Sequence, residues 1–390
     1  MEYIYLDHAA STALRPEVLE AMEPFLGPRF GNPSSIHRWG RQARDALEEA
    51  RERLAATLGA RRREIAFTAG GTEADNIAVL GCWRRRRMSR PDGGEAGAVV
   101  ISAVEHKAVS ESGKQAAREG AELIVLGVDE QGRVAVDTAA ESLLSAAAVV
   151  SVMWGNNEVG TIQPVAELAG LCRERGVPFH TDAVQAFGKV RVRVDECACD
   201  LLSVSAHKLG GPMGTGALFV REGVELEPLV FGGGQEWTLR SGTEAVASAV
   251  GLARAAELAA AELEFESGRL ESLRDELERR VLALVPDVTV NAAAAARLPH
   301  ISSLNVAGVD GAALVIGLDL AGVGASGGSA CRSGASAGSP VLAAMGRAIP
   351  GDATVRLSLG RSTTTAEIAA AAERLSSVVA RARADAGTAL

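Results

Sequence analysis

The feature that most constrains the fold is the alternation of short apolar segments with amphipathic helical stretches. Six segments are almost continuously apolar, which indicates strands buried on both faces of a sheet: residues 98–104, 123–128, 147–153, 177–181, 201–205 and 216–220. Helical patterns accompany them at residues 42–58, 106–118 and 165–175. Strands that alternate with helices are joined by crossover connections, so we expect an α/β fold with a mainly parallel sheet flanked by helices.

The pattern changes after residue 244. An Ala-, Leu-, Glu- and Arg-rich helical segment extends to about residue 285, with a candidate break at Gly268. A helix of that length suits a connection between two domains. The remainder mixes strands near residues 300–306 and 354–359 with helices near 311–318 and 366–383. We therefore expect a large domain over residues 15–260 and a smaller α+β domain formed by residues 1–14 and 261–390.

Charge and cysteine usage argue against several classes of function. The chain has 40 Lys and Arg against 49 Asp and Glu, a formal net charge of −9, whereas nucleic-acid binding needs a basic face. No segment approaches the roughly 18 uninterrupted apolar residues of a membrane span, and the acidic N-terminal segment is unlike a signal peptide. Five scattered cysteines fit a reducing compartment, so we expect a cytoplasmic protein. Cys197 and Cys199 lack a second ligand pair at zinc spacing and are interpreted as structural thiols, so no resident metal is expected.

Lys208 follows an apolar strand and precedes the glycine-rich residues 209–216. Burial of a free ammonium ion is costly, and conversion to an imine removes part of that cost and makes the nitrogen chemically useful. Ser205 and His207 beside it can donate hydrogen bonds to an anionic group. Taken alone, the segment is compatible with a cofactor lysine and with a surface turn.

Asp182 and Gly71 mark two further strand ends. A buried Asp182 carboxylate needs a cation, which the protonated pyridine nitrogen of pyridoxal phosphate would supply, and Gln185 is placed to reach the ring oxygen or the imine. A helix cap explains Asp182 equally well. Gly71 and Thr72 open a helix after a strand, an arrangement typical of a phosphate site, although such turns are common.

His106 and Asn157 follow two more strands. An imidazole at position 106 is suited to stack on the pyridine face and move protons. In an open parallel sheet, ligands bind outside the carboxyl ends of the strands. Because Gly71 and Thr72, His106, Asn157, Asp182 and Lys208 all occupy such ends, the sequence predicts that they form one cofactor site.

Cys331 and Arg356 lie in the C-terminal third. Cys331 sits in a glycine- and serine-rich loop beside Arg332, a setting that favours a reactive thiolate over a packed thiol, with a passive loop thiol as the alternative. Arg356 lies in an apolar strand, where a buried guanidinium needs an anion. The carboxylate of an amino-acid substrate and an internal salt bridge both satisfy that need.

Taken in order, these motifs resemble the cysteine desulfurases, which are pyridoxal-phosphate enzymes of fold type I in the class-V aminotransferase-like superfamily. The resemblance covers essentially the whole chain, through residues 5–10, 30–35, 71–73, 105–109, 156–158, 182–185, 205–208, 240–243, 328–331 and 356–358. It implies a seven-stranded mixed sheet in the large domain, a small domain that carries the Cys331 loop, and a homodimer.

The resemblance also implies residue roles. Lys208 would hold pyridoxal 5'-phosphate covalently, Asp182 would pair with its ring nitrogen, Gln185 would contact its ring oxygen, and His106 would stack on the ring beside Asn157. The implied phosphate ligands are Gly71, Thr72, Ser205, His207 and, from the neighbouring subunit, Thr243. Arg356 would bind the carboxylate of L-cysteine, and Cys331 would take its sulfur as a persulfide and leave alanine.

The Ser-Ala-Cys context of Cys331 and its long loop resemble the branch that serves iron–sulfur scaffolds and tRNA thiolation. We therefore expect a protein sulfur acceptor of one of these kinds as a partner, with Cys331 placed to contact a transient iron–sulfur cluster. Two alternatives stay open. One is another pyridoxal-phosphate enzyme of the superfamily, namely a selenocysteine lyase, C–S lyase or aminotransferase. The other is a non-catalytic sulfur-carrier or scaffold-binding protein with the same fold.

Overall fold

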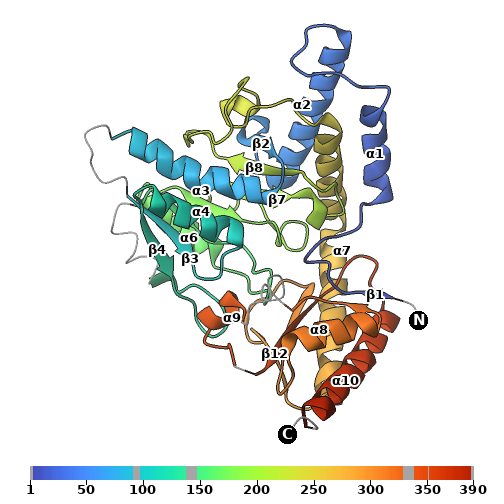
Figure 1. Ribbon diagram of the computed structural model, residues 1–390. Helices are drawn as coiled ribbons and strands as arrows, with labels where there is room; N and C mark the ends of the chain where they lie inside the picture. Colours follow the sequence, from blue (N-terminus) through green and yellow to red (C-terminus); the bar gives the residue numbers. More distant parts are fainter. Residues whose placement is uncertain (1–2, 91–96, 138–146, 328–337, 350, 388–390) are drawn as a thin grey trace.

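The computed structural model describes residues 3–90, 97–137, 147–327, 338–349 and 351–387 (Figure 1). The strands are β1 Ile4–Tyr5, β2 Ile65–Thr68, β3 Ala98–Ser102, β4 Glu122–Leu126, β5 Val149–Ser151, β6 Phe179–Asp182, β7 Leu201–Ser205, β8 Gly216–Val220, β9 Val288–Val290, β10 Ile301–Val306, β11 Val323–Gly324 and β12 Ala353–Ser358. The helices are α1 Pro16–Leu26, α2 Arg38–Leu58, α3 Gly71–Met88, α4 Lys107–Arg118, α6 Val165–Glu174, α7 Val246–Leu284, α8 Gly311–Leu320, α9 Pro340–Ala344 and α10 Thr365–Gly387.

The main sheet has seven strands in the order β2-β8-β7-β6-β5-β3-β4. The pairs β7·β6, β6·β5, β5·β3 and β3·β4 are parallel, whereas β8 runs antiparallel to both β2 and β7. The expectation of a mainly parallel, seven-stranded mixed sheet flanked by helices is confirmed. Since β2 and β7 both oppose β8, the carboxyl ends of β2, β7, β6, β5 and β3 lie at one edge.

Helices cover both faces of this sheet, which explains why its inner strands are largely apolar. Val99 and Ile101 of β3 pack in a cluster with residues of α3 and α4. Their neighbours Ala98 and Val100 join the larger cluster on the opposite face, to which α1, α2, α6 and α7 contribute. Successive strand residues point to opposite faces, so burial of both sets removes the polar alternation of a half-exposed strand.

Strand β4 differs from these inner strands. The expectation that residues 123–128 are buried on both faces was wrong, because β4 is an edge strand in which Glu122 and Val125 are exposed.

A second lobe lies below the main sheet in Figure 1. Its antiparallel sheet has the order β12-β10-β9, and β1 from the N-terminal segment pairs in parallel with β11. α8, α10 and the C-terminal half of α7 share its apolar cluster. The proposed domain bounds at residues 14/15 and 260/261 remain a prediction.

Helix α7 runs along both lobes for 39 residues without interruption. The candidate break at Gly268 was therefore wrong. One glycine costs a helix only about 1 kcal/mol, and Leu270, Leu273 and Leu277, which follow it, are buried in the lower cluster. No helix in the described part of the chain combines the length and apolar character needed to cross a membrane.

Candidate functional site

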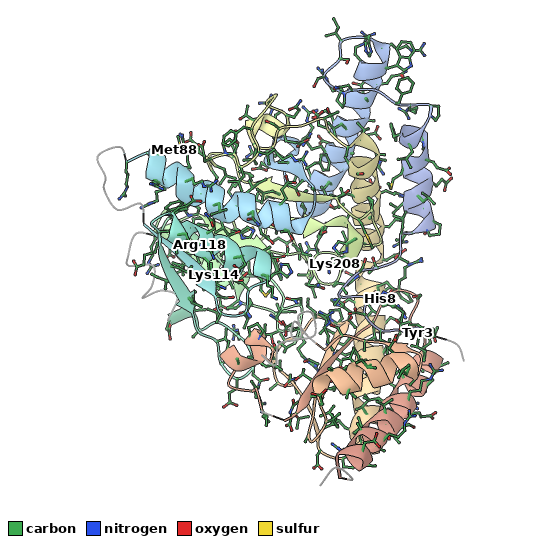
Figure 2. All side chains as sticks on the ribbon, viewed as in Figure 1. Tyr3, His8, Met88, Lys114, Arg118 and Lys208 are labelled. Atoms are coloured by element: carbon green, nitrogen blue, oxygen red, sulfur yellow. The ribbon has the colours of Figure 1, made fainter. Side chains whose placement is uncertain are left out.

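Five strand ends deliver the predicted residues to the edge of the main sheet. β2 leads to Gly71 and Thr72, β3 to His106, β5 to Asn157, and β6 ends at Asp182, while Lys208 closes a short 3-10 turn directly after β7. Figure 2 labels Lys208 on the side of the sheet that faces the lower lobe, near His8 of the N-terminal segment. The crossover topology places these residues along one edge in the strand order of the sheet.

Lys208 is held by backbone carbonyls. Its Nζ donates to Ala9 O at 2.5 Å and to Ala10 O at 2.8 Å. Burial, followed by the nearby Arg356 guanidinium, lowers the pKa of Lys208 to about 8, while Asp182 and Asp7 oppose the shift. The amine is therefore far more often uncharged near neutral pH than an ordinary lysine.

Gln185 meets Lys208 at the same carbonyl. Its Nε2 donates to Ala9 O at 2.8 Å. Its Oε1 lies 3.4 Å from Nε2 of His300, the residue directly before β10. The Gln185 amide thus lies beside the lysine amine, where the sequence placed it, and it also connects the main sheet to the lower lobe.

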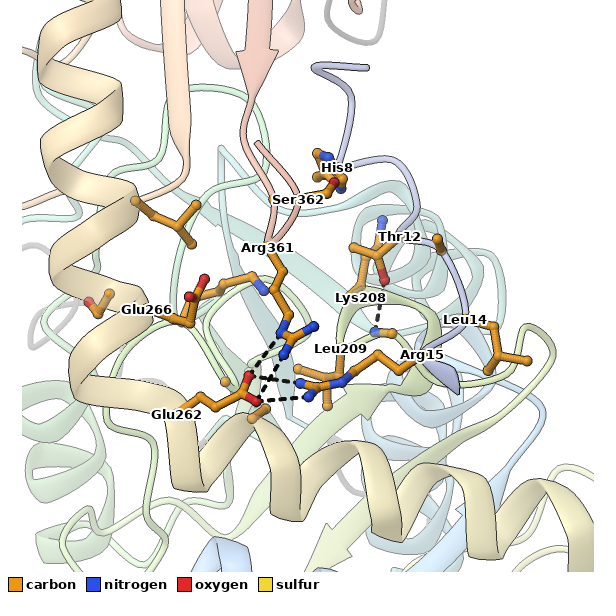
Figure 3. A pocket seen from close by; sticks show the side chains of 18 of the residues that line it. His8, Thr12, Leu14, Arg15, Lys208, Leu209, Glu262, Glu266, Arg361 and Ser362 are labelled. Carbon is orange, nitrogen blue, oxygen red and sulfur yellow. Dashed lines mark hydrogen bonds and ion pairs between the residues drawn. The ribbon is translucent and has the colours of Figure 1, made fainter. Parts of the chain in front are cut away.

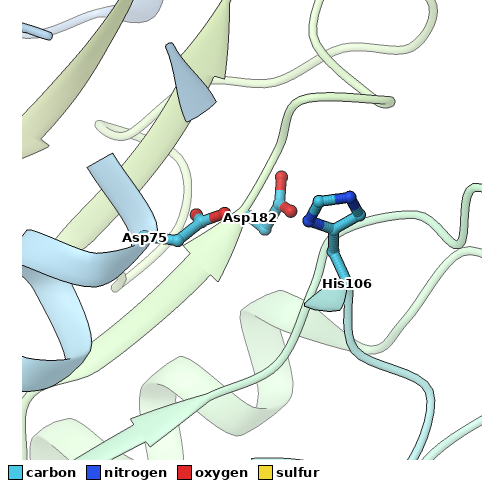
Figure 4. Close-up of side chains that lie close together, drawn as sticks. All are labelled: Asp75, His106 and Asp182. Atoms are coloured by element: carbon cyan, nitrogen blue, oxygen red, sulfur yellow. The ribbon is translucent and has the colours of Figure 1, made fainter. Parts of the chain in front are cut away.

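Asp182 is 5% exposed and its Oδ1 accepts the Val184 N–H at 2.8 Å. Burial raises the pKa of Asp182, and His106, the Val184 N–H and Lys208 oppose that shift. His106 caps α4, with Nδ1 accepting the Ala108 N–H at 3.2 Å, so Nε2 is the ring nitrogen that carries a proton. One carboxylate oxygen of Asp182, one of Asp75 and one ring nitrogen of His106 all lie within 4.8 Å of one another (Figure 4).

The turn that opens α3 packs closely against the residues that end β7 and follow β6. Gly70 has φ +146°, and a Cβ on Gly71 would lie 2.7 Å from Val184 Cγ2 and 3.7 Å from Ser205 Cβ. The two proposed phosphate residues Gly71 and Ser205 therefore lie side by side. Glu73 braces the turn, because its carboxylate accepts the Ala69 N–H and pairs with Arg240 at 3.1 Å.

The remaining proposed phosphate residues, His207, Thr72 and Thr243, differ in their exposure and in their contacts. His207 Nδ1 lies 3.3 Å from Ser11 Oγ, and burial, then Lys208, lowers the pKa of His207 to about 4, so its ring is neutral. Thr72 is exposed at the start of α3, and Thr243 is exposed in the segment before α7. A contribution of Thr243 across a subunit interface stays a prediction.

Arg356 in β12 is 7% exposed and already has protein partners. Its Nη2 pairs with Asp7 at 2.7 Å and its Nη1 donates to Asn157 O at 2.7 Å, whereas its buried Nε has no partner among the described residues. The internal salt bridge left open by the sequence is present. Of the paired asparagines, Asn156 is structural, with its amide bound to three backbone groups, and the Asn157 side chain is the one that remains partly exposed.

A cavity of about 290 Å³ adjoins Lys208 on the side of the N-terminal segment. Figure 3 shows Arg15 and Arg361 both paired with Glu262 at its margin. Of the predicted site residues that the structure describes, Lys208 alone lines it. The lysine therefore lies between this cavity and the strand ends.

Sequence reasoning missed three polar residues beneath the site, namely the buried Asp75 and His180 and the half-buried Glu105. Glu105 accepts Ser102 Oγ at 2.5 Å and Met153 N at 2.8 Å, and burial raises its pKa to about 8. The only signal in the sequence is an ionisable residue within an otherwise apolar stretch. Cys331 lies outside the described residues, so its predicted role has no geometry here.

Comparison with known proteins identifies the family. The class-V aminotransferase family matches residues 4–370. The chain is 44% identical over 366 residues to "Cysteine desulfurase IscS" of Dictyoglomus turgidum, covering 94% of this chain and 91% of that protein. Among solved structures it is similar to a "NifS-like protein", with TM-score 0.88, 32% identity and coverage of 97% and 100%. It is also similar to "SspA in complex with cysteine", with TM-score 0.79, 32% identity and coverage of 91% and 98%.

Class-V aminotransferases are a family of pyridoxal-phosphate enzymes. The match extends over almost the whole chain in sequence and in structure, and it includes both lobes and the strand ends described above. The chain therefore belongs to the class-V aminotransferase family and, within it, to the cysteine desulfurases.

Proposed function

We propose that this chain holds pyridoxal phosphate on Lys208, releases alanine from L-cysteine and retains the sulfur on Cys331. The observation that supports the proposal best is that Lys208 and Asp182 lie at the ends of the neighbouring strands β7 and β6, with the turn at Gly71 packed beside Ser205. The substrate is supported by the desulfurase relatives and by the cysteine complex of a structural neighbour.

The residues at the strand ends suit this cofactor. Asp182 is a buried carboxylate whose one hydrogen-bond donor among the described residues is the Val184 N–H, which suits a cationic ring nitrogen. Lys208 presents an amine whose pKa is lowered to about 8. Val184 leaves no room for a side chain at Gly71, and the N-terminus of α3, which begins there, is the kind of position that binds a phosphate. These are the three chemical requirements of an aldehyde-bearing pyridine phosphate.

When bound, pyridoxal phosphate supplies an electron sink for bonds at the substrate α-carbon. Lys208 holds the cofactor and, once displaced, its Nζ takes or gives a proton near neutral pH. The Asp182 carboxylate keeps the ring nitrogen protonated. The Val184 N–H fixes the orientation of that carboxylate. His106 lies close to Asp182 and would stack on the ring and donate a proton from Nε2, since Nδ1 accepts the Ala108 N–H.

Arg356 is the proposed carboxylate ligand. Its Nε is buried and has no partner among the described residues, and its Nη2 is shared with Asp7. A substrate carboxylate would use the open part of the guanidinium fork while Asp7 and the Asn157 carbonyl fix its plane. The Asn157 backbone carbonyl contacts Arg356 and Asn157 is partly exposed, which supports a role in contacting substrate and cofactor.

Sulfur delivery completes the proposal. Cys331 would accept the substrate sulfur as a persulfide and pass it to an acceptor for iron–sulfur cluster assembly or tRNA thiolation. A homodimer, with Thr243 of one subunit at the phosphate of the other, is part of the same proposal. The described cysteines are all free thiols, which supports a reducing compartment such as the cytoplasm.

Alanine production from L-cysteine tests the proposal. Wild-type protein should release alanine and become labelled with persulfide sulfur, whereas Cys331→Ser should lose both by orders of magnitude, because removal of a nucleophile abolishes the step it performs. Cys172→Ser, a buried thiol far along the chain, is the matched control and should behave as wild type.

The other outcomes point to the alternatives. Full alanine production by Cys331→Ser would reject its persulfide role and favour a lyase. Formation of a keto acid with transfer of the amino group would favour an aminotransferase. Purified protein that gains no visible cofactor absorbance after addition of pyridoxal phosphate would favour a non-catalytic protein.

A further inference from the structure

Asp75 lies directly behind Asp182. It is in the second turn of α3 and is 1% exposed, and its carboxylate, that of Asp182 and the His106 ring have ligand atoms within 4.8 Å of one another (Figure 4). Its Oδ1 is buried without a hydrogen-bond partner among the described residues and lies 3.6 Å from His180 Nε2. The site therefore contains two adjacent buried carboxyl groups rather than one.

His180, the histidine that lies 3.6 Å from Asp75, offers it no positive charge. His180 lies between Ser151 Oγ at 2.8 Å and Ser203 Oγ at 3.0 Å, and burial lowers its pKa to about 3, so it is neutral. Glu105 is a third acid whose charge would act against ionisation of Asp75. A hydrogen bond from Ser203 favours the Asp75 anion, but it is outweighed by burial and by the neighbouring acids.

Asp182 is better supported as an anion. The Val184 N–H, His106 and Lys208 all stabilise its negative charge. Ionisation of Asp75 is opposed first by its burial and then by the charge of Asp182. Both raise the pKa of Asp75 well above its ordinary value. Two like charges at this distance in a buried site do not both form, and the proton stays on the carboxyl group with the weaker support.

We propose that Asp75 is a positioning residue that stays an uncharged carboxylic acid at neutral pH and thereby leaves Asp182 as the single anion opposite the cofactor ring. This inference rests on the proposed function, because Asp182 needs its charge for the ring nitrogen. One ring cation is matched by one carboxylate. An ionised Asp75 would add a second, unmatched charge, whereas the acid form fills the same space without one.

Conversion of each carboxyl group to an amide separates the two roles. Asp75→Asn has the shape of the uncharged acid, so the dissociation constant for pyridoxal phosphate should stay within about threefold of wild type. Asp182→Asn should raise that constant by about 10- to 1,000-fold, which corresponds to the 1–3 pKa units of an acid beside a cation. Asp45→Asn, an exposed site on α2, is the matched control and should leave the constant unchanged.

Infrared difference spectroscopy on the purified full chain reads the proton directly. At neutral pH the wild-type spectrum should contain the carbonyl band of a protonated carboxylic acid that Asp75→Asn lacks. In Asp182→Asn, where the neighbouring charge is gone, that band should disappear at a lower pH than in wild type. A shared shift of this kind requires interaction between the two carboxyl groups and would not follow from a merely structural role.

Two results would overturn the inference. One is a wild-type minus Asp75→Asn spectrum that contains only ionised carboxylate bands. The other is an Asp75→Asn variant that weakens cofactor binding as much as Asp182→Asn does. The infrared band is read with or without cofactor, so failure of the wild-type chain to bind pyridoxal phosphate would reject the proposed function and still leave the state of Asp75 decided.

Discussion

The two lobes hold their parts of the candidate site in different ways. On the main sheet, Asp182 and His106 are fixed by N–H groups only two residues away, Val184 and Ala108. In the lower lobe, Arg356 is fixed by Asp7 and by the Asn157 carbonyl, which are 349 and 199 residues distant along the chain. Asp182 and His106 are therefore oriented by local structure. Arg356 is oriented only when the lobes and the N-terminal segment are assembled, and Lys208 likewise depends on Ala9 and Ala10 of that segment.

This contrast predicts that changes at the strand ends act first on cofactor binding, and changes around Arg356 act first on substrate binding. Lys208→Ala should have the largest effect, because it removes both the covalent attachment and a proton-transfer group. Turnover should fall by about 10²–10⁴-fold or more, and the visible absorbance of the attached cofactor should be lost. Lys189→Ala, which changes the other lysine of the cavity beside Lys208, should keep the absorbance.

The pH dependence of cofactor uptake should follow Lys208. Its amine attacks an aldehyde only when uncharged, so the uptake rate of cofactor-free protein should rise about tenfold per pH unit up to its pKa of about 8 and then level off. The same lowered pKa means that the unfolded lysine binds more protons, so the free energy of unfolding should increase between pH 8 and about 10.5. Stopped-flow absorbance measures the rate, and a midpoint near 10 would show that Lys208 is not buried as described.

Arg356→Lys tests the other half of the comparison. Lysine keeps the charge but loses the fork, and hydrogen bonds to a charged group contribute about 1.5–3 kcal/mol, so KM for cysteine should rise about 10- to 100-fold. The dissociation constant for pyridoxal phosphate should change little. Steady-state kinetics measure KM, and cofactor titration measures the dissociation constant. Weaker cofactor binding with an unchanged KM would contradict the assignment of substrate binding to Arg356.

Two glycines provide the smallest and most local test. Gly71→Ala places a methyl group 2.7 Å from Val184 Cγ2, so unfolding free energy should fall by about 1–3 kcal/mol and cofactor binding should weaken. Gly268→Ala in α7 meets nothing within 4 Å and should stabilise the chain by up to about 1 kcal/mol. Denaturant unfolding compares them, and equal effects would mean that close packing at the turn is unimportant.

The strand-end half was readable in the sequence because a parallel sheet gathers its carboxyl ends at one edge. Knowing that Lys208 and Asp182 each follow an apolar run was enough to place them together. The sheet order, with β6 between β7 and β5, was not needed for that inference. The long-range partner of Arg356 was beyond reach, since pairing with Asp7 depends on how the N-terminal segment crosses between lobes.

Asp75 was missed for a different reason. Acidic residues are common in the first turns of helices, and the sequence does not say which face of α3 turns toward the sheet. The break assigned to Gly268 was wrong because the free-energy cost of one glycine in a helix is smaller than the free energy gained by burying the leucines that follow it. Both errors concern tertiary packing, which local patterns do not encode.

Reduction with borohydride tests the central claim most directly. The chain is loaded with pyridoxal phosphate, reduced so that the cofactor is fixed to its lysine, digested and mapped by mass spectrometry. Lys189 also has a pKa lowered to about 8 by burial and borders the same cavity, so it is a real competitor. The account predicts the cofactor mass on the peptide that contains Lys208, and its presence on Lys189 instead would contradict the site described here.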